Sequence, residues 1–265
     1  RYSFVASDPF LLFQAWDRRV RIQDSQNCCE EQHPDPLRRL QEYLQRYRAP
    51  HLGGLPRFCG GAVGYAAYDA VRYTEHLPHP PSDDRGLPDL CFAFYDRMVI
   101  FDHINKTLAV VALAHVDRQH LPECYERACQ RVDELVESLR EPGHDLPLAD
   151  ISWNSTAFTG APDWALPTAT DLGQIALSRP VRSNFTRERF CDAVRRCQEY
   201  IRAGDAFQIV LSQRLQTETH AHPFDLYRVL RVVNPSPFMF YLACGNLTLV
   251  GSSPEIMVRV EGDKI

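Results

Sequence analysis

Apolar and polar residues recur along the chain with two different periods, which predict both strands and helices. Strict alternation on either side of Ser7-Asp8-Pro9 predicts two short strands within residues 1–22, and the polar run 24–34 reads as a loop. Further strands are predicted within 58–72, over 90–101 and 107–115, and over 206–215, 238–243 and 247–251. Apolar residues at helical spacing predict four helices, over 36–47, 122–140, 186–203 and 223–232.

The ends of several predicted helices carry recognisable stop and start residues. Asp35-Pro36 supplies an N-cap and a first-turn proline, Thr186 supplies a second N-cap, and Gly204 stands at a C-terminal stop. Strands and helices show no regular βαβα alternation. We therefore expect an α+β fold with largely antiparallel sheets and helices packed outside them.

A change of composition divides the chain. Residues 141–181 contain five prolines and three glycines and show no periodicity, so we predict a linker there between domains at 1–140 and 182–265. The chain opens on Arg1, and the strand predicted from Glu255 onward reaches the turn Glu261-Gly262-Asp263 without a second arm. From this we expect a fragment in which the second domain is truncated at its C-terminus.

The bulk composition excludes several classes of protein. A formal net charge of −5 gives no electrostatic footprint for nucleic acid and no polybasic patch for a membrane. No apolar run approaches the roughly 20 residues of a membrane helix. The nine cysteines contain no C-x-x-C pair, which argues against a disulfide framework or a zinc site and favours the reducing cytoplasm.

Three segments carry candidate chemistry, and each also has an ordinary structural interpretation. A strand over 206–215 would place Gln208, Ser212 and Arg214 on one face, where a guanidinium could pair with a carboxylate. That face could equally be an exposed sheet surface, which the pattern alone favours.

The corner Asn234-Pro235-Ser236-Pro237-Phe238-Met239 is rigid, because its two prolines fix φ at alternate positions, and it could line a pocket for a flat ligand. Glu255 follows the tight turn Gly251-Ser252-Ser253-Pro254 and, beside apolar walls, would have a raised pKa and could donate a proton. The corner could instead be a strand entrance, and Glu255 a solvated carboxylate.

Taken together, six motifs resemble anthranilate synthase component I, and they occur in order along nearly the whole chain. They are Arg1–Phe4, Phe58–Tyr65, Tyr68–Arg72, Gly204–Arg214, Asn234–Leu242 and Val250–Glu255. The resemblance implies an enzyme that aminates chorismate with ammonia and Mg²⁺ and then eliminates pyruvate to give anthranilate, in tryptophan biosynthesis. A glutamine amidotransferase subunit would supply the ammonia. Residues 1–140 would be the family's N-terminal domain and residues 182–265 the start of its chorismate-binding domain.

The resemblance also implies roles for single residues. Glu255 matches the carboxylate thought to protonate the departing C4 hydroxyl of chorismate. Gln208 stands where water-using relatives carry a lysine base, and a neutral amide cannot act as that base. The residues of the corner 234–239 match one wall of the site at which tryptophan inhibits the family; they are Asn234, Pro235, Ser236, Pro237, Phe238 and Met239.

Other parts of the family pattern are not found between Arg1 and Ile265. By resemblance, the second wall of the tryptophan site should precede Arg1, and the catalytic histidine and the Mg²⁺-binding glutamates should follow Ile265. The 265 residues alone are therefore expected to be inactive. Two alternatives stay open, aminodeoxychorismate synthase component I of the folate branch and a non-catalytic binding module. Ser236, Met239 and Gly251 favour the tryptophan branch over the folate branch.

Overall fold

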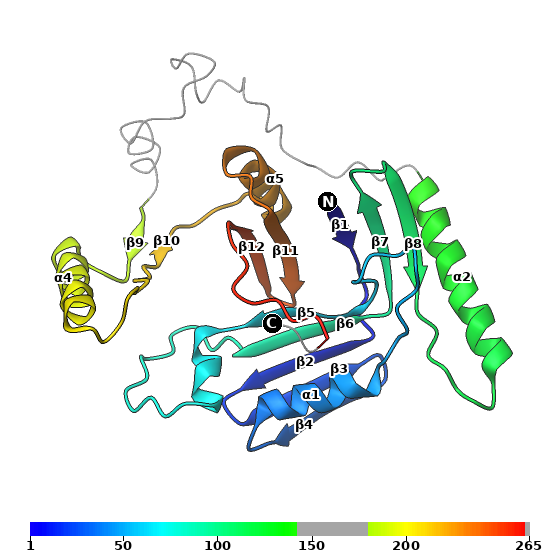
Figure 1. The fold of residues 1–265 in the computed structure, drawn as a ribbon, viewed down its shortest axis with the longest axis horizontal. Coiled ribbons are helices and arrows are strands. Elements are labelled where there is room, and N and C mark those ends of the chain that lie inside the picture. The colour runs from blue at the N-terminus through cyan, green and yellow to red at the C-terminus, as the bar shows by residue number, and fades with distance from the viewer. Residues whose placement is uncertain (142–179, 263–265) are drawn as a thin grey trace, which may run out of the picture. The chain divides into compact units, whose positions relative to one another are not determined.

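The computed structural model of the protein describes residues 1–141 and 180–262 (Figure 1). These residues form two compact units. The first unit holds residues up to 141 together with 242–249, and the second holds 180–241 and 250–262. Each unit is built from antiparallel strands and helices.

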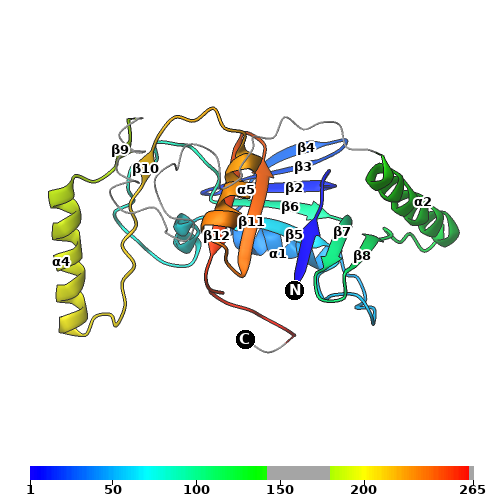
Figure 2. The same ribbon diagram turned by 90° about the horizontal axis from the view of Figure 1, so that it is seen from above.

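A five-stranded antiparallel sheet forms the larger part of the first unit, in the order β4-β3-β2-β6-β5. Its strands are β2 (Leu11–Trp16), β3 (Arg19–Asp24), β4 (Cys28–Gln32), β5 (Gly61–Ala66) and β6 (Leu90–Tyr95). Alternate residues of the central strands are buried on one face, and helix α1 (Pro36–Arg46) crosses that face (Figure 1, Figure 2). Burying this face supplies the main apolar core of the unit.

The core between α1 and the sheet contains fully buried side chains at its centre. Phe13 and Leu90 are 0% exposed. The buried members of this core are Leu11, Phe13, Ala15, Val20, Ile22, Leu40, Ala70, Leu90 and Phe94.

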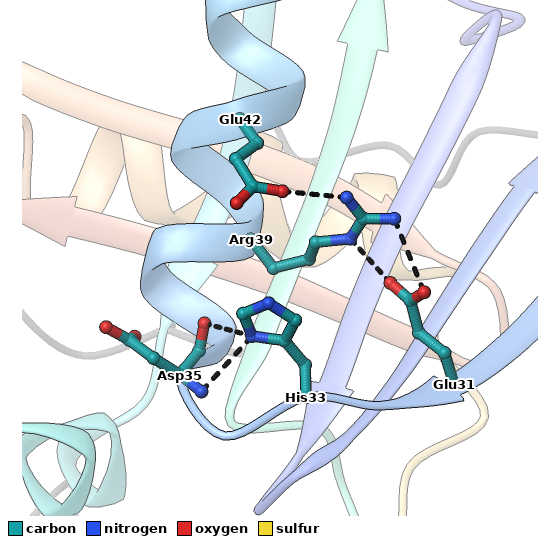
Figure 3. Close-up of polar contacts among 5 residues, drawn as sticks. All are labelled: Glu31, His33, Asp35, Arg39 and Glu42. Atoms are coloured by element: carbon teal, nitrogen blue, oxygen red, sulfur yellow. Dashed lines mark hydrogen bonds and ion pairs between the residues drawn. The ribbon is translucent and has the colours of Figure 1, made fainter.

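Polar contacts fix α1 against the edge of the sheet. Asp35 caps the helix by accepting a hydrogen bond from the backbone N–H of Arg38 at 3.0 Å. Figure 3 shows the Arg39 guanidinium held between Glu31 of β4, at 2.5 and 3.3 Å, and Glu42 of its own helix, at 2.7 Å. Because β4 pairs only with β3, these ion pairs link the edge strand to the helix that covers the sheet.

A three-stranded antiparallel sheet, in the order β1-β7-β8, completes the first unit. It consists of β1 (Tyr2–Val5), β7 (Arg97–Asp102) and β8 (Thr107–Ala112), and α2 (Leu121–Arg140) packs against β8. The chain passes from the larger sheet into this one at Asp96, between β6 and β7. Asp96 is 5% exposed, and its Oδ2 accepts hydrogen bonds from Arg131 at 2.7 Å and His115 at 2.8 Å.

In its described residues, the second unit contains two helices and a pair of two-residue strands. The helices are α4 (Arg187–Ala203) and α5 (Pro223–Val233), and the short strands are β9 (Arg182–Ser183) and β10 (Leu215–Gln216). The hairpin of β11 (Phe238–Cys244) and β12 (Leu247–Ser253) begins and ends in this unit, and its tip, 242–249, belongs to the first. Cys244, at that tip, is a neighbour of Cys91 in β6. Burial, and secondarily this neighbour, raise the pKa of Cys91 to about 12.

The predicted α+β class with antiparallel sheets is confirmed. All four predicted helices form, Thr186 caps α4 through the backbone N–H of Arg189, and Gly204 ends it at a φ of 83°. The strands predicted over 238–243 and 247–251 also form, as the two arms of a hairpin. The linker predicted over 141–181 lies, except for its ends, outside the described residues.

Several strand predictions were wrong, each for a physical reason. The segment 24–34 was predicted as a loop but contains β4, an exposed edge strand with no apolar face. The apolar run 90–101 was predicted as one strand but divides at Asp96 into strands of two sheets. The end of the 58–72 segment forms a 3-10 helix, η1 (Tyr68–Tyr73), and not a strand.

The strand predicted over 206–215 is absent except for Leu215, the first residue of β10, because a strand forms only where a neighbour accepts its hydrogen bonds and here only β9 does so. The strand predicted after Glu255 does not form either, and Met257 is 97% exposed. Among the residues that the structure describes, no helix is both long and apolar enough to cross a membrane.

Candidate functional site

Two of the motifs singled out in the sequence meet in the second unit. The Ser236 hydroxyl of the proline corner donates to the Ser253 carbonyl oxygen at 2.5 Å. In return, the Ser252 hydroxyl donates to the Asn234 carbonyl oxygen, also at 2.5 Å. The corner that leads into β11 and the turn that leaves β12 are therefore held together by two hydrogen bonds running in opposite directions.

The corner is shaped by its own residues. Pro235 and Pro237 have fixed φ angles and no N–H, so the backbone there cannot continue α5 or join a central strand. The Ser236 hydroxyl also accepts the backbone N–H of Phe238 at 3.2 Å, which fixes the start of β11. Phe238 is 40% exposed and Met239 is partly buried, so both side chains retain surface that a ligand could contact.

An aromatic cluster attaches this corner to α5. The ring of Tyr241 on β11 meets the edge of Phe224 at a centroid distance of 5.5 Å and lies 6.1 Å from Tyr227. Phe224 and Tyr227 stack at 5.9 Å on the same face of the helix. These ring contacts pack the β11–β12 hairpin against α5, so the corner and the turn at its ends are carried by a packed hairpin.

Gly251 allows the two strands of the hairpin to pack as they do. A Cβ atom at Gly251 would lie 2.0 Å from Cζ of Phe240, far inside van der Waals contact. The Phe240 ring therefore lies directly over the Gly251 backbone. This contact positions the Gly251-Ser252-Ser253 segment that carries the two hydrogen-bonding serines.

Glu255 lies at the bend that follows β12 and is exposed to solvent. The Ser253 hydroxyl donates to its backbone carbonyl oxygen at 3.0 Å, so the turn is fixed although the carboxylate is exposed. The strand predicted from Glu255 onward does not form, so Glu255, Met257 and Arg259 share no strand face. The carboxylate is thus carried by the same turn that the corner serines hold.

Gln208 is not joined to this arrangement by any described contact. It is exposed, in a segment without regular structure, and within the described residues its side chain makes no hydrogen bond. Neighbouring side chains are equally open, with Phe207 95% and Val210 83% exposed. The face of Gln208, Ser212 and Arg214 predicted from the period of a strand was therefore wrong.

Within the described residues, no group of three or more histidine, cysteine, aspartate or glutamate side chains could hold a metal ion. The described residues therefore do not fit a magnesium site, and we derive no reaction step through a metal.

Sequence reasoning named Ser252 and Ser253 only as parts of a turn and missed that they tie the two motifs together. The signal was present, because serines beside a proline at a strand end commonly hydrogen-bond to nearby backbone groups. Which backbone groups they reach depends on the pairing of β11 with β12, which residue types alone do not specify.

The comparisons with known proteins all point to the same family. Residues 3–265 match the family described as chorismate binding enzyme. The chain is 36% identical over 261 residues to anthranilate synthase component 1 of Acetivibrio thermocellus, covering 98% of this chain and 49% of that protein. It is 37% identical over 269 residues to anthranilate synthase component 1 of Pseudomonas aeruginosa, again covering 98% and 49%. The chain thus spans about half the length of these relatives.

A solved structure shows the same similarity in three dimensions. The crystal structure of anthranilate synthase component I from Streptococcus pneumoniae matches with a TM-score of 0.70 and 28% sequence identity. The match covers 99% of this chain and 52% of that one.

Proposed function

Because the chain belongs to the chorismate-binding enzyme family, we propose that it forms part of an anthranilate synthase component I. In this role it contributes to converting chorismate and ammonia into anthranilate and pyruvate, in tryptophan biosynthesis. The relatives with that name match along nearly the whole chain and not only at one motif. Since the chain spans about half of each, the complete reaction draws on residues outside these 265.

The observation that carries this proposal is the pair of serine hydrogen bonds between the corner and the turn. Asn234 and Ser236 belong to one motif of the resemblance, and Ser252 and Ser253 belong to another. Two motifs separated in sequence by a whole hairpin are therefore one structural element. The Ser253 hydroxyl in turn bonds to the backbone carbonyl oxygen of Glu255, so this element also carries Glu255.

Within the reaction we assign Glu255 as the general acid. Its carboxyl group would give a proton to the C4 hydroxyl of chorismate as that group leaves as water and nitrogen bonds to the ring. Gln208 is assigned a place beside the incoming nucleophile, where its neutral amide cannot deprotonate water, so ammonia is the nucleophile. Mg²⁺ belongs to the proposed complete enzyme, and its ligands are expected beyond residue 265.

Regulation and partners complete the proposal. The segment Asn234–Met239 would form one wall of a tryptophan site, with the exposed ring of Phe238 and the thioether of Met239 against the indole. A glutamine amidotransferase subunit would supply the ammonia. The rigid corner supports the proposal of a tryptophan site, and the proposal of an amidotransferase partner rests on the family relationship.

The test uses the whole gene product that contains these residues. With chorismate, an ammonium salt and Mg²⁺ it should release pyruvate and form anthranilate, which is followed by its fluorescence. Glu255→Gln should lower turnover by a factor of roughly 10² or more, the usual scale for a lost general acid. Glu218→Gln, a second exposed carboxylate in the same unit, serves as the matched control and should leave turnover unchanged.

Two outcomes would overturn the proposal. Formation of an aminated chorismate without release of pyruvate would place the protein in the folate branch as an aminodeoxychorismate synthase component I. Consumption of no chorismate by the whole gene product would leave only the binding-module interpretation. Turnover of Glu255→Gln within a few-fold of the parent would remove that residue from the mechanism without affecting the family assignment.

A further inference from the structure

A cavity of about 660 Å³ lies in the first unit, and none of the residues assigned above lines it. It is bounded by the segment that follows α1, by the glycines that lead into β5, and by the ends of β6 and β8. Its volume is within the range of about 300–1,000 Å³ typical of small-molecule sites. The cavity therefore has the size of a binding site and belongs to neither motif of the hairpin.

One wall of the cavity is aromatic. The rings of Phe10, Tyr47 and His115 contact one another edge to face, with centroid distances of 4.9, 5.0 and 5.9 Å. Phe94 supports this wall from the sheet, 6.1 Å from both Phe10 and Tyr47. Tyr47 is 41% exposed, so a large part of its ring faces open space. Such a wall suits a flat, apolar molecular body.

The carboxylate of Asp96, in the cavity lining, is already neutralised. Asp96 lines the cavity, and its Oδ2 is bonded to Arg131 of α2 and to His115. Asp117, the second acidic residue of the lining, accepts hydrogen bonds from His120 at 2.9 Å and from the backbone N–H of Gln119 at 3.1 Å. Neither carboxylate is therefore left to attract a cation.

Part of the cavity lining is cationic. Arg46, Arg48 and Arg57 all line the cavity, together with His51. Arg46 lies over the Tyr43 ring at 4.4 Å and has no carboxylate partner among the described residues. Arg48 is exposed, and within the described chain it makes no ion pair at all. The guanidinium groups of Arg46 and Arg48 can therefore bind the carboxylate of a ligand, through two parallel hydrogen bonds.

From this arrangement we propose that the cavity is a binding site for a small planar carboxylate, with its ring against Tyr47 and His115 and its carboxylate at Arg48. Gly61 also lines the cavity, where a Cβ atom would meet only Phe58 at 3.7 Å and a positive φ of 126° disfavours any side chain. A flat ligand can therefore approach that backbone closely. This site is separate from the tryptophan wall proposed at Asn234–Met239.

Benzoate is the probe, because it has one ring and one carboxylate. Titration into the protein, followed by ligand-observed NMR and calorimetry, should give saturable binding. Arg48→Gln should weaken it about tenfold or more, the effect of losing a charge-assisted hydrogen bond. Arg18→Gln is the matched control, because Arg18 is an exposed arginine on the β2–β3 turn with no described side-chain partner. It should leave the affinity unchanged.

Two further arms test the shape and charge of the site. Benzamide, which keeps the ring and loses the charge, should bind about tenfold or more weakly than benzoate. Tyr47→Leu should weaken benzoate binding while Arg48 is intact. Absence of saturable binding, equal affinity for benzamide, or an unchanged affinity of Arg48→Gln would each overturn the proposal. None of these binding measurements uses anthranilate formation, so they test the site independently of the proposed function.

Discussion

Replacing Gly64 by alanine should destabilise the first unit more than any other Gly→Ala change in β5. A Cβ atom there would lie 1.9 Å from the carbonyl oxygen of Cys91 and 2.7 Å from Cα of Phe92. Both are backbone atoms of β6, which pairs with β5 through Gly64 and Phe92. No rotation of a side chain can relieve this overlap, so the strand itself must move.

The size of the movement follows from the distances. Ordinary contact begins near 3.4 Å, so the overlap at Cys91 requires about 1.5 Å of separation, taken as 3.4 minus 1.9. Strands normally lie about 4.8 Å apart and hold hydrogen bonds of about 2.9 Å, so a shift of this size breaks the local ladder. Losing two or three such bonds, at about 1 kcal/mol each, costs about 3 kcal/mol. That is a large part of the 5–15 kcal/mol by which domains are usually stable.

Urea unfolding followed by circular dichroism measures this cost. With a slope of about 2 kcal/mol per molar urea, the unfolding midpoint should fall by roughly 1.5 M. The matched control is Gly53→Ala, because a Cβ atom at Gly53 meets no atom within 4 Å and its φ is not positive. Its midpoint should change little or rise slightly. Equal midpoints for the two variants would refute the argument from backbone overlap.

Three further predictions concern stability, alkaline pH and inhibition. Arg39→Gln should lower the free energy of unfolding by about 1–2 kcal/mol in urea titrations, because its pair with Glu31 is only partly exposed, whereas Arg140→Gln, in an exposed pair, should change it by less than about 0.5 kcal/mol. Burial raises the pKa of Tyr65 from 10.0 to about 12. The stabilising contribution of its protonated hydroxyl is therefore complete below pH 10 and is lost as the pH rises toward 12. In Tyr65→Phe the urea midpoint should fall less over this range, and a pH profile identical to that of the parent would contradict the argument from Tyr65. In the whole gene product, Met239→Thr should raise the tryptophan concentration needed for half-inhibition while sparing anthranilate formation, and an unchanged value would contradict the pocket assignment.

Helices were predictable from the sequence because the signals that define them are local. Asp35, Thr186 and Gly204 perform their capping roles through contacts within four residues, so no knowledge of the tertiary fold was needed. The hairpin was predictable for the same reason, since its strands are separated only by the turn at Gly245.

Strand predictions were wrong where the pairing of a strand depends on residues distant in sequence. The apolar run that contains Asp96 gives no local sign that two sheets share it, because the division depends on Arg131 and His115. The candidate site was predictable as two motifs, and their connection through Ser236 and Ser253 required the structure. The cavity beside Arg48 was not foreseen, because its lining comes from five separate segments that share no pattern.

The pairing of β1 with β7 has a consequence for synthesis of the chain. Tyr2 pairs with Asp102, so β1 meets β7 only after about one hundred residues have followed it. At about 5–20 residues per second, a ribosome needs roughly 5–20 s to supply that partner. During this interval β2, β3, β4 and α1, whose contacts are close in sequence, can already associate. We expect this local group to form first and β1 to join last, which makes folding of the three-stranded sheet the slower event.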